Sequence, residues 1–507
     1  MNDETIICRC EDVTYKEVID TINEGYTTLD EIKRKLRCGM GACQGRTCMR
    51  LIARVIKEKT GKHLDEILMP TSRPPEKPVP LGIFASYEVA SKNARNCDAT
   101  ESVKHFPSNL GNAPHFRRCK ANNSEAFSEV KMTDVAIIGG GINGCALAYE
   151  LAKKGVNATV FEKGYLGSGA TGRCGGGIRQ QFDTEDNIRL AMESVKIFEK
   201  MEKELAYDIE YDQGGYLVLA HSDDETERFK ENVKLQKSLG LNVKFMEKDE
   251  IHALVPILDL EGAKAVGGTF CQTDGHANPF RVTEAYAKNA ERLGAKIKTF
   301  TEVKGIKKEK TFEIITEKEK IKADVVVNVA GCYSKNIAEM VGVKLPNKPY
   351  RHEILATEIL KPVLKPMIIS FTDGIYFCQH KTGQIVGGIG NPDEPSGINP
   401  SSSFWFLEKM AKTITRYIPV FKNLNVLRQW AGMYDVTPDA RPILGKTKVE
   451  NFFVACGFSG HGFMVAPAVA KGISNLITDG KTSIPIDNLS IDRFKKGIVK
   501  KEGAVVG

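Results

Sequence analysis

The sequence predicts a protein of the α/β (α+β) class, in which a large unit built on a parallel sheet follows a small, mainly helical unit. Three observations support this prediction. An apolar strand near residue 134 leads into spaced glycines and a helix pattern. Five of the 13 cysteines fall within the first 48 residues. Five prolines stand between residues 70 and 80, where one unit gives way to the next. A chain of 507 residues is long enough for about three units.

The overall composition excludes several classes of protein. A hydrophobic fraction of 42% and a charged fraction of 27% are typical of water-soluble globular proteins. No apolar run approaches the ~20 residues needed to cross a bilayer. The N-terminal sequence is acidic, unlike a signal peptide, so we expect a cytoplasmic protein. The net charge of +7 comes from interspersed lysines and carboxylates, which indicates solvated faces and no nucleic-acid partner.

The N-terminal unit, residues 1–70, is organised around its cysteines. They stand as Cys8 and Cys10, followed at a distance by Cys38, Cys43 and Cys48. Helix patterns cover 13–22, 29–36 and 49–59, and Thr28 with Glu31 forms a capping box before the second helix. Short helices that bring two cysteine pairs together would create a four-thiolate metal site. Structural zinc usually takes CxxC pairs, and this spacing differs, although zinc and metal-free cysteines both remain alternatives.

This cysteine pattern resembles the bacterioferritin-associated-ferredoxin-like [2Fe–2S] domain. The residues that carry the resemblance are the CRCEDVT run from Cys8 and the RCGMGACQGRTC run that ends at Cys48. The resemblance implies a [2Fe–2S] cluster whose metal ligands are Cys8, Cys10, Cys43 and Cys48. Cys38 would then be a spare thiol. Glycines between the cysteines would let backbone N–H groups point at the sulfurs and tune the reduction potential.

Residues 71–131 read as a proline-rich linker. The prolines from Pro70 to Pro80 favour an extended chain. Residues 85 to 131 show no sustained hydrophobic periodicity of a helix or strand. Cys97 and Cys119 are too far apart to suggest a site. A mobile tether is the simpler expectation, and a partly ordered collar around the neighbouring domain is the alternative.

The strongest motif in the chain lies at the start of the third unit, residues 132–500. An apolar strand, residues 134–138, runs into GxGxxG, and a second strand ends just before an acidic residue; the residues concerned are Gly139, Gly141, Gly144 and Glu162. The first glycine allows a tight turn, the second lets a pyrophosphate approach the backbone, and the third allows close packing of helix and strand. The acidic residue, about 20 positions further on, suits the ribose hydroxyls. The motif predicts a dinucleotide site at a helix N-terminus.

Three further segments of this unit are rich in small residues. The run from residue 167 to 177 carries six glycines, so that backbone lies against a flat or phosphorylated ligand. A strand at 323–329 ends at Ala330 and Gly331, and a loop before a helix carries Gly460, His461 and Gly462. Backbone donors in such a loop suit the edge of an isoalloxazine ring.

Together these segments resemble the FAD-dependent amino-acid oxidase superfamily over nearly all of residues 132–500. The GRCGGGIRQQF run, which ends at Phe182, looks most like the β subunits of dye-linked L-proline dehydrogenase and of hydrogen cyanide synthase or opine oxidase. The resemblance implies a Rossmann-type FAD domain (about 132–210, 277–345 and 426–500) and an antiparallel-sheet substrate domain (about 211–276 and 346–425). It implies FAD held by Gly139, Gly141, Gly144, Glu162, Thr171, Gly172, Arg173, Gly331, Gly460, His461 and Gly462.

The same resemblance suggests three catalytic candidates. Arg179 would bind the substrate carboxylate, since relatives of the sarcosine-oxidase type place an arginine at this end of the glycine run, and a bidentate donor suits a carboxylate. A structural arginine is the alternative. Tyr434 matches a substrate-pocket tyrosine, although a packed core tyrosine would look the same. His276 could reach the pocket, with an ordinary surface histidine as its alternative.

Three departures from the sarcosine-oxidase pattern refine the expected activity. Gly432 stands where that family attaches FAD through a cysteine, so we expect noncovalent FAD. Met464 replaces a carboxylate-binding lysine, which places more weight on Arg179. The segment 383–387 lacks the lysine that activates oxygen, although Lys381 lies just ahead of it. We therefore expect a dehydrogenase and not an oxidase.

The leading prediction is a dehydrogenase of a secondary amine or amino acid of the proline, hydroxyproline, sarcosine or opine type. Hydride would pass to flavin N5, and electrons would pass on to the [2Fe–2S] cluster or to a partner flavoprotein or electron-acceptor subunit in a hetero-oligomer. A glycerol-3-phosphate or 2-hydroxy acid dehydrogenase is the enzymatic alternative. An electron-transfer or redox-sensing subunit that has lost catalysis is a third possibility, supported only by Met464.

Overall fold

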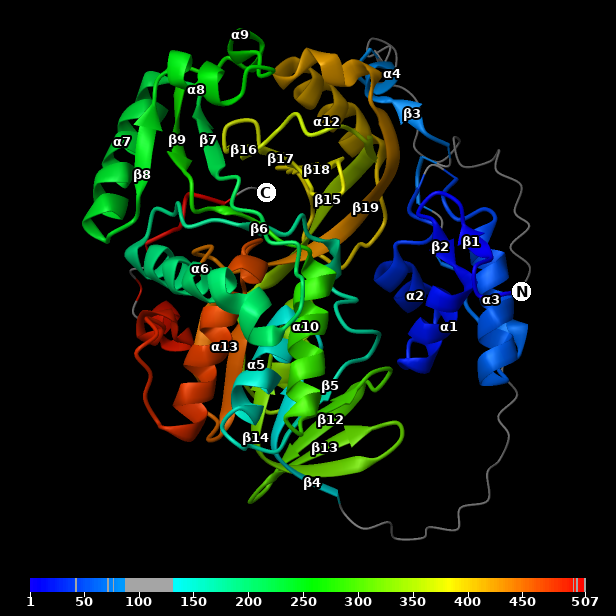
Figure 1. The fold of residues 1–507 in the computed structure, drawn as a ribbon. Helices are drawn as coiled ribbons and strands as arrows, with labels where there is room; N and C mark the ends of the chain where they lie inside the picture. The colour runs from blue at the N-terminus through cyan, green and yellow to red at the C-terminus, as the bar shows by residue number, and fades with distance from the viewer. Residues whose placement is uncertain are drawn as a thin grey trace, which may run out of the picture.

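The structure is a computed structural model, and it describes residues 1–41, 43–70, 73–75, 77–86, 131–495, 497 and 500–505. Figure 1 shows a small N-terminal unit beside a large body made of two sheets with their helices. The expected position of Cys97 and Cys119, and the linker between 87 and 130, lie outside the described residues. No helix within the described ranges has both the length and the apolar character that crossing a membrane requires.

The N-terminal unit contains a two-stranded sheet and three helices that surround a small apolar core. Its elements are β1 (Ile6–Cys8), β2 (Val13–Thr14), α1 (Tyr15–Asn23), α2 (Leu29–Leu36) and α3 (Cys48–Thr60). These confirm the three predicted helices. Thr28 caps α2, and its hydroxyl accepts a hydrogen bond from the Glu31 backbone N–H while the Glu31 side chain binds back to the Thr28 N–H, as the capping box predicts.

An eight-stranded sheet forms the base of the large body. Its strands are β11 (Lys296–Lys298), β5 (Ala158–Phe161), β4 (Lys131–Ile138), β14 (Lys320–Asn328), β13 (Phe312–Thr316), β12 (Val303–Lys308), β20 (Ile443–Lys446) and β21 (Phe452–Cys456). The order β11-β5-β4-β14-β21 is parallel, as expected for a Rossmann-type domain. β14 also pairs antiparallel with β13 at its start, so the β12–β13 hairpin extends the sheet.

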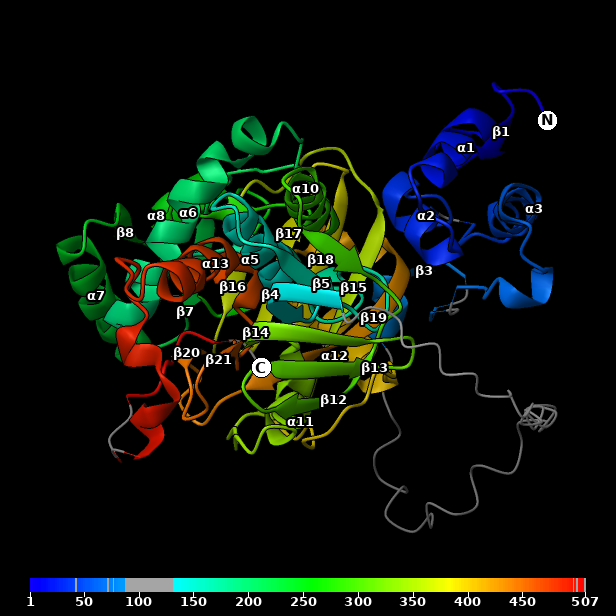
Figure 2. The same ribbon diagram turned by 90° about the horizontal axis from the view of Figure 1, so that it is seen from below.

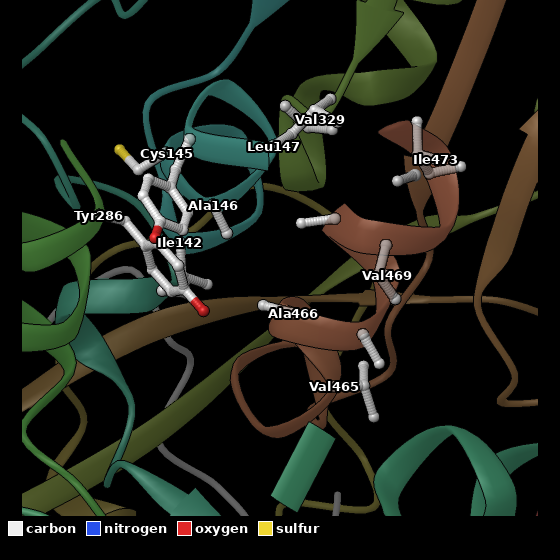
Figure 3. Close-up of a cluster of buried hydrophobic side chains, with 14 of the residues drawn as sticks. Ile142, Cys145, Ala146, Leu147, Tyr286, Val329, Val465, Ala466, Val469 and Ile473 are labelled. Carbon is white, nitrogen blue, oxygen red and sulfur yellow. The ribbon is translucent and has the colours of Figure 1, made fainter. Parts of the chain in front are cut away.

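Helices cover one face of this sheet and bury its main apolar core. They are α5 (Ile142–Ala152), α6 (Glu185–Leu205), α10 (Pro279–Arg292) and α13 (Gly462–Thr478). Figure 3 shows Val465, Ala466, Val469 and Ile473 of α13 beside the α5 segment, with Tyr286 of α10 next to Ile142 and Cys145. Small residues at Gly144, Ala146 and Ala148 allow these helices to pack closely, because α5 is buried along almost its whole length.

A nine-stranded sheet forms the second layer, in the order β3-β19-β15-β18-β17-β16-β7-β9-β8. The strands are β3 (Val79–Pro80), β19 (Asn425–Val436), β15 (Lys348–Ile359), β18 (Gln384–Ile389), β17 (Ile375–Gln379), β16 (Met367–Ser370), β7 (Tyr216–Ala220), β9 (Gly267–Cys271) and β8 (Val243–Met246). All neighbours are antiparallel except β16 and β7. This confirms the expected antiparallel sheet. Helix α12 (Phe404–Tyr417) packs on one face of it.

The remaining helices and strands lie around these layers. They are α4 (Leu81–Ala85), β6 (Gly177–Ile178), α7 (Asp223–Ser238), α8 (Lys248–Leu254), α9 (Leu260–Ala263), β10 (Gly275–His276) and α11 (Ser334–Glu339). β6 and β10 form a short antiparallel pair next to the glycine-rich run. This pair connects the two layers, because it ties residues 177–178 to the segment that leads into α10.

Two element positions differ from the expected boundaries. β19 belongs to the nine-stranded sheet, where it pairs with β15 over its length, so the third segment of the FAD domain begins after Val436 and not near 426. β3 and α4 lie within the expected linker. β3 pairs with β19, and Leu81 and Phe84 of α4 are buried in the core beneath α12. Residues 79–85 are therefore part of the folded body and not of a linker.

Contacts between side chains hold the N-terminal unit against the large body. Figures 1 and 2 both show α2 on the side of the unit that faces the body. Arg34 donates a hydrogen bond to the Tyr165 hydroxyl and lies over its ring, and Arg428 of β19 donates to the Gly39 carbonyl at 2.9 Å. These contacts bring the expected cysteine site to the same side of the molecule as the glycine-rich loop.

Candidate functional site

The glycine turn between β4 and α5 has the geometry expected of a dinucleotide cradle. Gly139 has φ +119°, a conformation that side chains rarely adopt, and its added Cβ would lie 2.5 Å from the Val329 carbonyl oxygen. A Cβ on Gly144 would lie 1.9 Å from the Gly139 carbonyl oxygen. Both positions therefore require glycine. Gly141 is the N-cap of α5, which leaves the first N–H groups of the helix facing the cavity.

Glu162 lies at the end of β5 and fixes the loop beside this turn. Its carboxylate accepts hydrogen bonds from the Gly140 N–H at 2.8 Å, the Gly164 N–H at 2.7 Å and the Ser168 hydroxyl at 3.1 Å. A carboxylate offers about four acceptor positions, so one remains for a ligand hydroxyl. Glu162 lines the cavity and is 8% exposed, which places it where a ribose would be recognised.

A cavity of about 400 Å³ runs from this turn to the loop before α13. It brings together most of the predicted cofactor residues: Gly139, Gly141, Glu162, Thr171, Arg173, Gly331, Gly460 and Gly462. The remaining three lie around it. Gly144 packs beneath the turn, Gly172 lines a neighbouring cavity and His461 lines a smaller one. The N-termini of α5 and α13 both reach the cavity, and helix N-termini favour anionic groups. The residues present fit an extended FAD.

A smaller cavity of about 70 Å³ adjoins the Gly460 end and contains two of the three catalytic candidates. Arg179 and Tyr434 both line it, and Tyr434 also lines the larger cavity. The Arg179 guanidinium donates to the carbonyl oxygens of Gln181 and Ala504 and lies 4.3 Å from the centre of the Phe182 ring. Two of its five N–H groups are thus engaged by neutral carbonyls, which leaves donors for a carboxylate.

Burial determines the protonation states of the side chains that line this smaller cavity. Burial lowers the pKa of Arg179, which nevertheless stays charged as a guanidinium does in proteins. Burial raises the pKa values of the Tyr216 and Tyr376 hydroxyls, so both stay protonated. The cavity is therefore walled by neutral hydroxyls with one buried cation, an arrangement that suits a substrate bearing a carboxylate.

His276, the third catalytic candidate, lies outside the lining of these cavities. It is on β10, its ring stacks on His380 at 4.9 Å, and its Nε2 lies 3.2 Å from the Gln379 carbonyl oxygen. Burial lowers the pKa of His276, so the ring is neutral. These contacts are those of a buried structural histidine.

Two cavity residues were not anticipated from the sequence. His352 of β15 and Tyr376 of β17 line the larger cavity, and the His352 ring stacks on Tyr376 and Tyr434. Each lies on a strand whose pattern reads as ordinary β-structure, so neither stands out in the sequence. The pairing of β15 with β19, which sets His352 opposite Gly432, is the signal that would have found it.

A third cavity of about 560 Å³ lies between the N-terminal unit and the large body. Its lining is rich in cations from both parts of the chain: Lys33, Arg34, Arg37, Arg73, Lys163, Arg173 and Arg428. Burial and the neighbouring cations lower the pKa of Lys33 to about 8 and that of Arg428 to about 10. This cavity shares Arg173 and the residues around it with the 400 Å³ cavity of the cofactor residues, so the two are neighbours.

The four predicted metal ligands lie near one another in the N-terminal unit. The thiols of Cys10 and Cys43 are hydrogen-bonded, and so are those of Cys8 and Cys48. A Cβ on Gly41 would lie 2.3 Å from the Cys10 Cβ, so glycine is needed beside this cysteine. The buried Cys38 thiol instead contacts the Ile32 carbonyl oxygen at 3.7 Å. Within the described residues, however, no three or more His, Cys, Asp or Glu side chains are arranged as a metal site.

Comparison with known proteins covers both folded parts of the chain. Residues 134–476 match the family model described as FAD dependent oxidoreductase, and residues 2–87 match the model described as sarcosine oxidase A3 domain. The second match replaces the expected ferredoxin-like domain, whose [2Fe–2S] assignment is not confirmed. It extends past residue 70 to include β3 and α4, in agreement with their place in the fold.

Individual relatives point in the same direction. The chain is 30% identical over 382 residues to the sarcosine oxidase subunit beta of Arthrobacter sp, a match that spans 74% of this chain and 94% of that protein. It is 27% identical over 388 residues to the mitochondrial dimethylglycine dehydrogenase of Rattus norvegicus, covering 72% of this chain and 45% of that protein. Among solved structures, the L-proline dehydrogenase from P.horikoshii has 38% identity and a TM-score of 0.70, covering 73% of this chain and 100% of that one. With a family model matched over more than half its length and a cavity that fits the cofactor, the chain belongs to the FAD-dependent oxidoreductase family.

Proposed function

We propose that this protein is a dehydrogenase of a secondary amine or amino acid of the proline, hydroxyproline, sarcosine or opine type. The observation that carries the proposal is the position of Arg179 in the small cavity, next to Tyr434 and the Gly460 end of the FAD cavity. A buried cation with free donors is suited to an amino acid's carboxylate. The relatives are named for activity on sarcosine, dimethylglycine and L-proline. These names support the same substrate class.

The residues of the site would act by binding, orienting and excluding water. Arg179 would fix the carboxylate, and the hydroxyls of Tyr376 and Tyr434, which share a side-chain hydrogen bond, would limit the orientations of the amine. Phe463 and Met464 would keep the chamber apolar. FAD, when bound, supplies the acceptor for the hydride that leaves the substrate α-carbon. Arg173 donates to the Ala431 carbonyl and to the Ser168 carbonyl, and would thereby hold the loop over the cofactor.

We further propose noncovalent FAD and poor reactivity with oxygen. At Gly432 a side chain would contact Arg173, and the residue itself offers no atom for attachment. The lining of the small cavity contains no lysine, and Lys381 is exposed in the turn before β18. A lysine ammonium beside the flavin would favour charge build-up on oxygen, so the absence of a lysine from this described lining favours a dehydrogenase.

The test is anaerobic bleaching of the purified flavoprotein. Bleaching by L-proline, hydroxyproline, sarcosine or an opine is expected, with dye reduction much faster than oxygen consumption. A flavin that stays oxidised with all four overturns the proposal, and bleaching by glycerol-3-phosphate or a 2-hydroxy acid would establish the alternative. Release of FAD on acid precipitation is expected for a noncovalent cofactor.

For the N-terminal unit, we propose a [2Fe–2S] cluster held by Cys8, Cys10, Cys43 and Cys48 as the next electron carrier. The grouping of these four thiols supports the proposal. Anaerobically purified protein should contain two irons and two sulfides per chain, from the composition of such a cluster. Cys43→Ser should abolish both, whereas Cys38→Ser should retain them. Stoichiometric zinc, or no metal, would overturn the proposal.

The electrons must finally leave the chain, so we propose a partner flavoprotein or electron-acceptor subunit in a hetero-oligomer. The name of the Arthrobacter relative, a subunit beta, supports this. Co-purification of tagged protein from its native host, followed by mass measurement in solution, tests it. A homogeneous single-chain species that reduces dyes at full rate would argue against a partner.

A further inference from the structure

His352 occupies a place in the nine-stranded sheet that a glycine, Gly388, keeps open. It lies on β15, opposite Gly432 of β19 in the antiparallel register. On the other side, β18 presents Gly388, where an added Cβ would lie 2.9 Å from His352 Nε2 and 2.8 Å from the Tyr376 hydroxyl. Because Gly388 has no side chain, the imidazole and the tyrosine hydroxyl share this open space beside the FAD cavity that both residues line.

Two tyrosines fix the orientation of the imidazole. The His352 ring stacks on Tyr434, with centroids 4.4 Å apart and planes 8° apart, and on Tyr376, at 5.6 Å and 14°. Both tyrosines line the FAD cavity and the small cavity that contains Arg179. The stack therefore holds the imidazole in the wall of the FAD cavity, next to the two tyrosines that line both cavities.

The imidazole has an unused polar atom. His352 is only 6% exposed, and its Nε2 has no hydrogen-bond partner among the described residues. Leaving a buried polar atom unpaired costs about 1–3 kcal/mol. Two other histidines avoid this cost: the buried His276 lies against the Gln379 carbonyl, and the half-buried His380 lies against the Gly175 carbonyl. An unpaired Nε2 on a cavity wall is what remains when the partner is a ligand.

His461 is the second buried histidine with an unpaired Nε2, and it lines the small cavity. It stands at the N-cap of α13, and burial lowers its pKa to about 4, although the neighbouring Glu502 acts in the opposite direction. The helix N-terminus also disfavours positive charge on the ring. No charged group acts on His352, whose pKa burial alone lowers to about 4. His352 is therefore a neutral hydrogen-bond acceptor or donor throughout the physiological pH range. The groups that face it are the two tyrosine hydroxyls.

We propose that His352 Nε2 accepts a hydrogen bond from the N–H of the amine substrate and so selects amines over ethers of the same shape. The inference rests on the proposed function, because it assumes a substrate that carries both a carboxylate and an N–H. Arg179 holds the substrate carboxylate. His352 holds the substrate nitrogen so that the lone pair of this nitrogen is turned toward the α-carbon side. Two fixed contacts leave the substrate one orientation.

The experiment uses two planar ligands that cannot be oxidised in the same way as the substrate. Pyrrole-2-carboxylate and furan-2-carboxylate carry the same carboxylate and differ in N–H against oxygen. Their dissociation constants are measured on the FAD-loaded full-length enzyme from the perturbation of the flavin absorbance. The wild type should prefer the pyrrole by roughly 10-fold, the value of one net hydrogen bond. His352→Phe, which keeps the aromatic stack, should reduce this preference to within about 2-fold.

The matched control is His380→Phe, the same exchange at a half-buried, stacked histidine outside the lining of the FAD cavity and of the cavity that contains Arg179. It should keep the wild-type preference. Equal binding of both ligands by the wild type, or an unchanged preference in His352→Phe, overturns the inference. Loss of FAD from His352→Phe alone would assign the histidine to the cofactor and also overturn it. Anaerobic bleaching of the wild type by amines is scored separately, so failure of the proposed function is distinguished from failure of the histidine assignment.

Discussion

At the scale of single residues, the site depends on groups that burial holds in one ionisation state. Arg179 is the clearest case, since it is 4% exposed and donates only to main-chain carbonyl oxygens in the hydrogen bonds described. A guanidinium that is desolvated without a full counter-charge gains most from an anionic ligand. The chain therefore keeps this cation at a free-energy cost that the substrate carboxylate would offset.

Arg179→Ala is expected to raise KM for the amino-acid substrate by at least ~10-fold, about 1.4 kcal/mol of lost binding. The reason is that no other buried cation lines the small cavity in the described structure. Arg179→Lys should recover part of the affinity, because the charge returns without the fork of donors. Steady-state kinetics check both. Arg189→Ala, an exposed arginine of α6, is the control. A KM within 3-fold of the wild type in Arg179→Ala would remove the carboxylate role.

The glycine of the cofactor turn gives a second residue-scale prediction. Gly144→Ala would place a Cβ 1.9 Å from the Gly139 carbonyl oxygen, so α5 must move away from the turn and the cradle opens. We expect the variant to be purified with less than a tenth of the wild-type FAD, roughly 1.4 kcal/mol or more of lost affinity. FAD content per chain is the measurement. Gly305→Ala in β12, where the nearest atom is 3.6 Å away, should retain full FAD.

At the scale of elements, features set by residues close together in the sequence could be predicted. Features set by pairing between distant segments could not. The capping box at Thr28 and the GxGxxG turn were predicted because they depend on residues three to five positions apart. The sheet to which β19 belongs depends on its pairing with β15, about 75 residues away in sequence, which no local pattern reveals. His352 was missed for the same reason, since the glycine that keeps its place open, Gly388, lies on another strand, β18.

Helix α4 shows how composition can mislead at this scale. Its surroundings are rich in proline, which predicts a linker, yet Leu81 is fully buried and Phe84 is 9% exposed with its ring edge-on to Phe404. Phe84→Ala should destabilise the large body by about 3–5 kcal/mol, because it opens a cavity in the core under α12. Thermal denaturation of the holoenzyme measures this. Ile83→Ala, 58% exposed on the same helix, should leave the midpoint within experimental error; equal effects would place α4 outside the core.

At the scale of the whole molecule, the two folded parts meet through buried polar contacts instead of a shared apolar core. Apolar side chains of the N-terminal unit form a core of their own, separate from those of the large body. The contact between the parts is charged on both sides, and cations from both line the intervening cavity. Such an interface is held by a few specific pairs, so single residues should control docking.

Glu284 of α10 is the residue on which docking should depend most. Its carboxylate accepts hydrogen bonds from the Tyr26 hydroxyl and from Lys35 of α2, both at 2.5 Å. Burial alone would raise the pKa of Glu284, but the hydrogen bonds from Lys35 and Tyr26 outweigh it and lower the pKa.

Glu284→Ala leaves Lys35 and Tyr26 partly buried without this partner, which typically costs 2–5 kcal/mol across an interface. We expect faster amide exchange throughout α2, measured by mass spectrometry on the holoenzyme, and slower electron transfer to dyes if electrons leave through the N-terminal unit. Glu291→Ala, an exposed carboxylate on the same helix, should change neither. Unchanged exchange in Glu284→Ala would mean that the cation contacts of Arg34 and Arg428 alone hold the parts together.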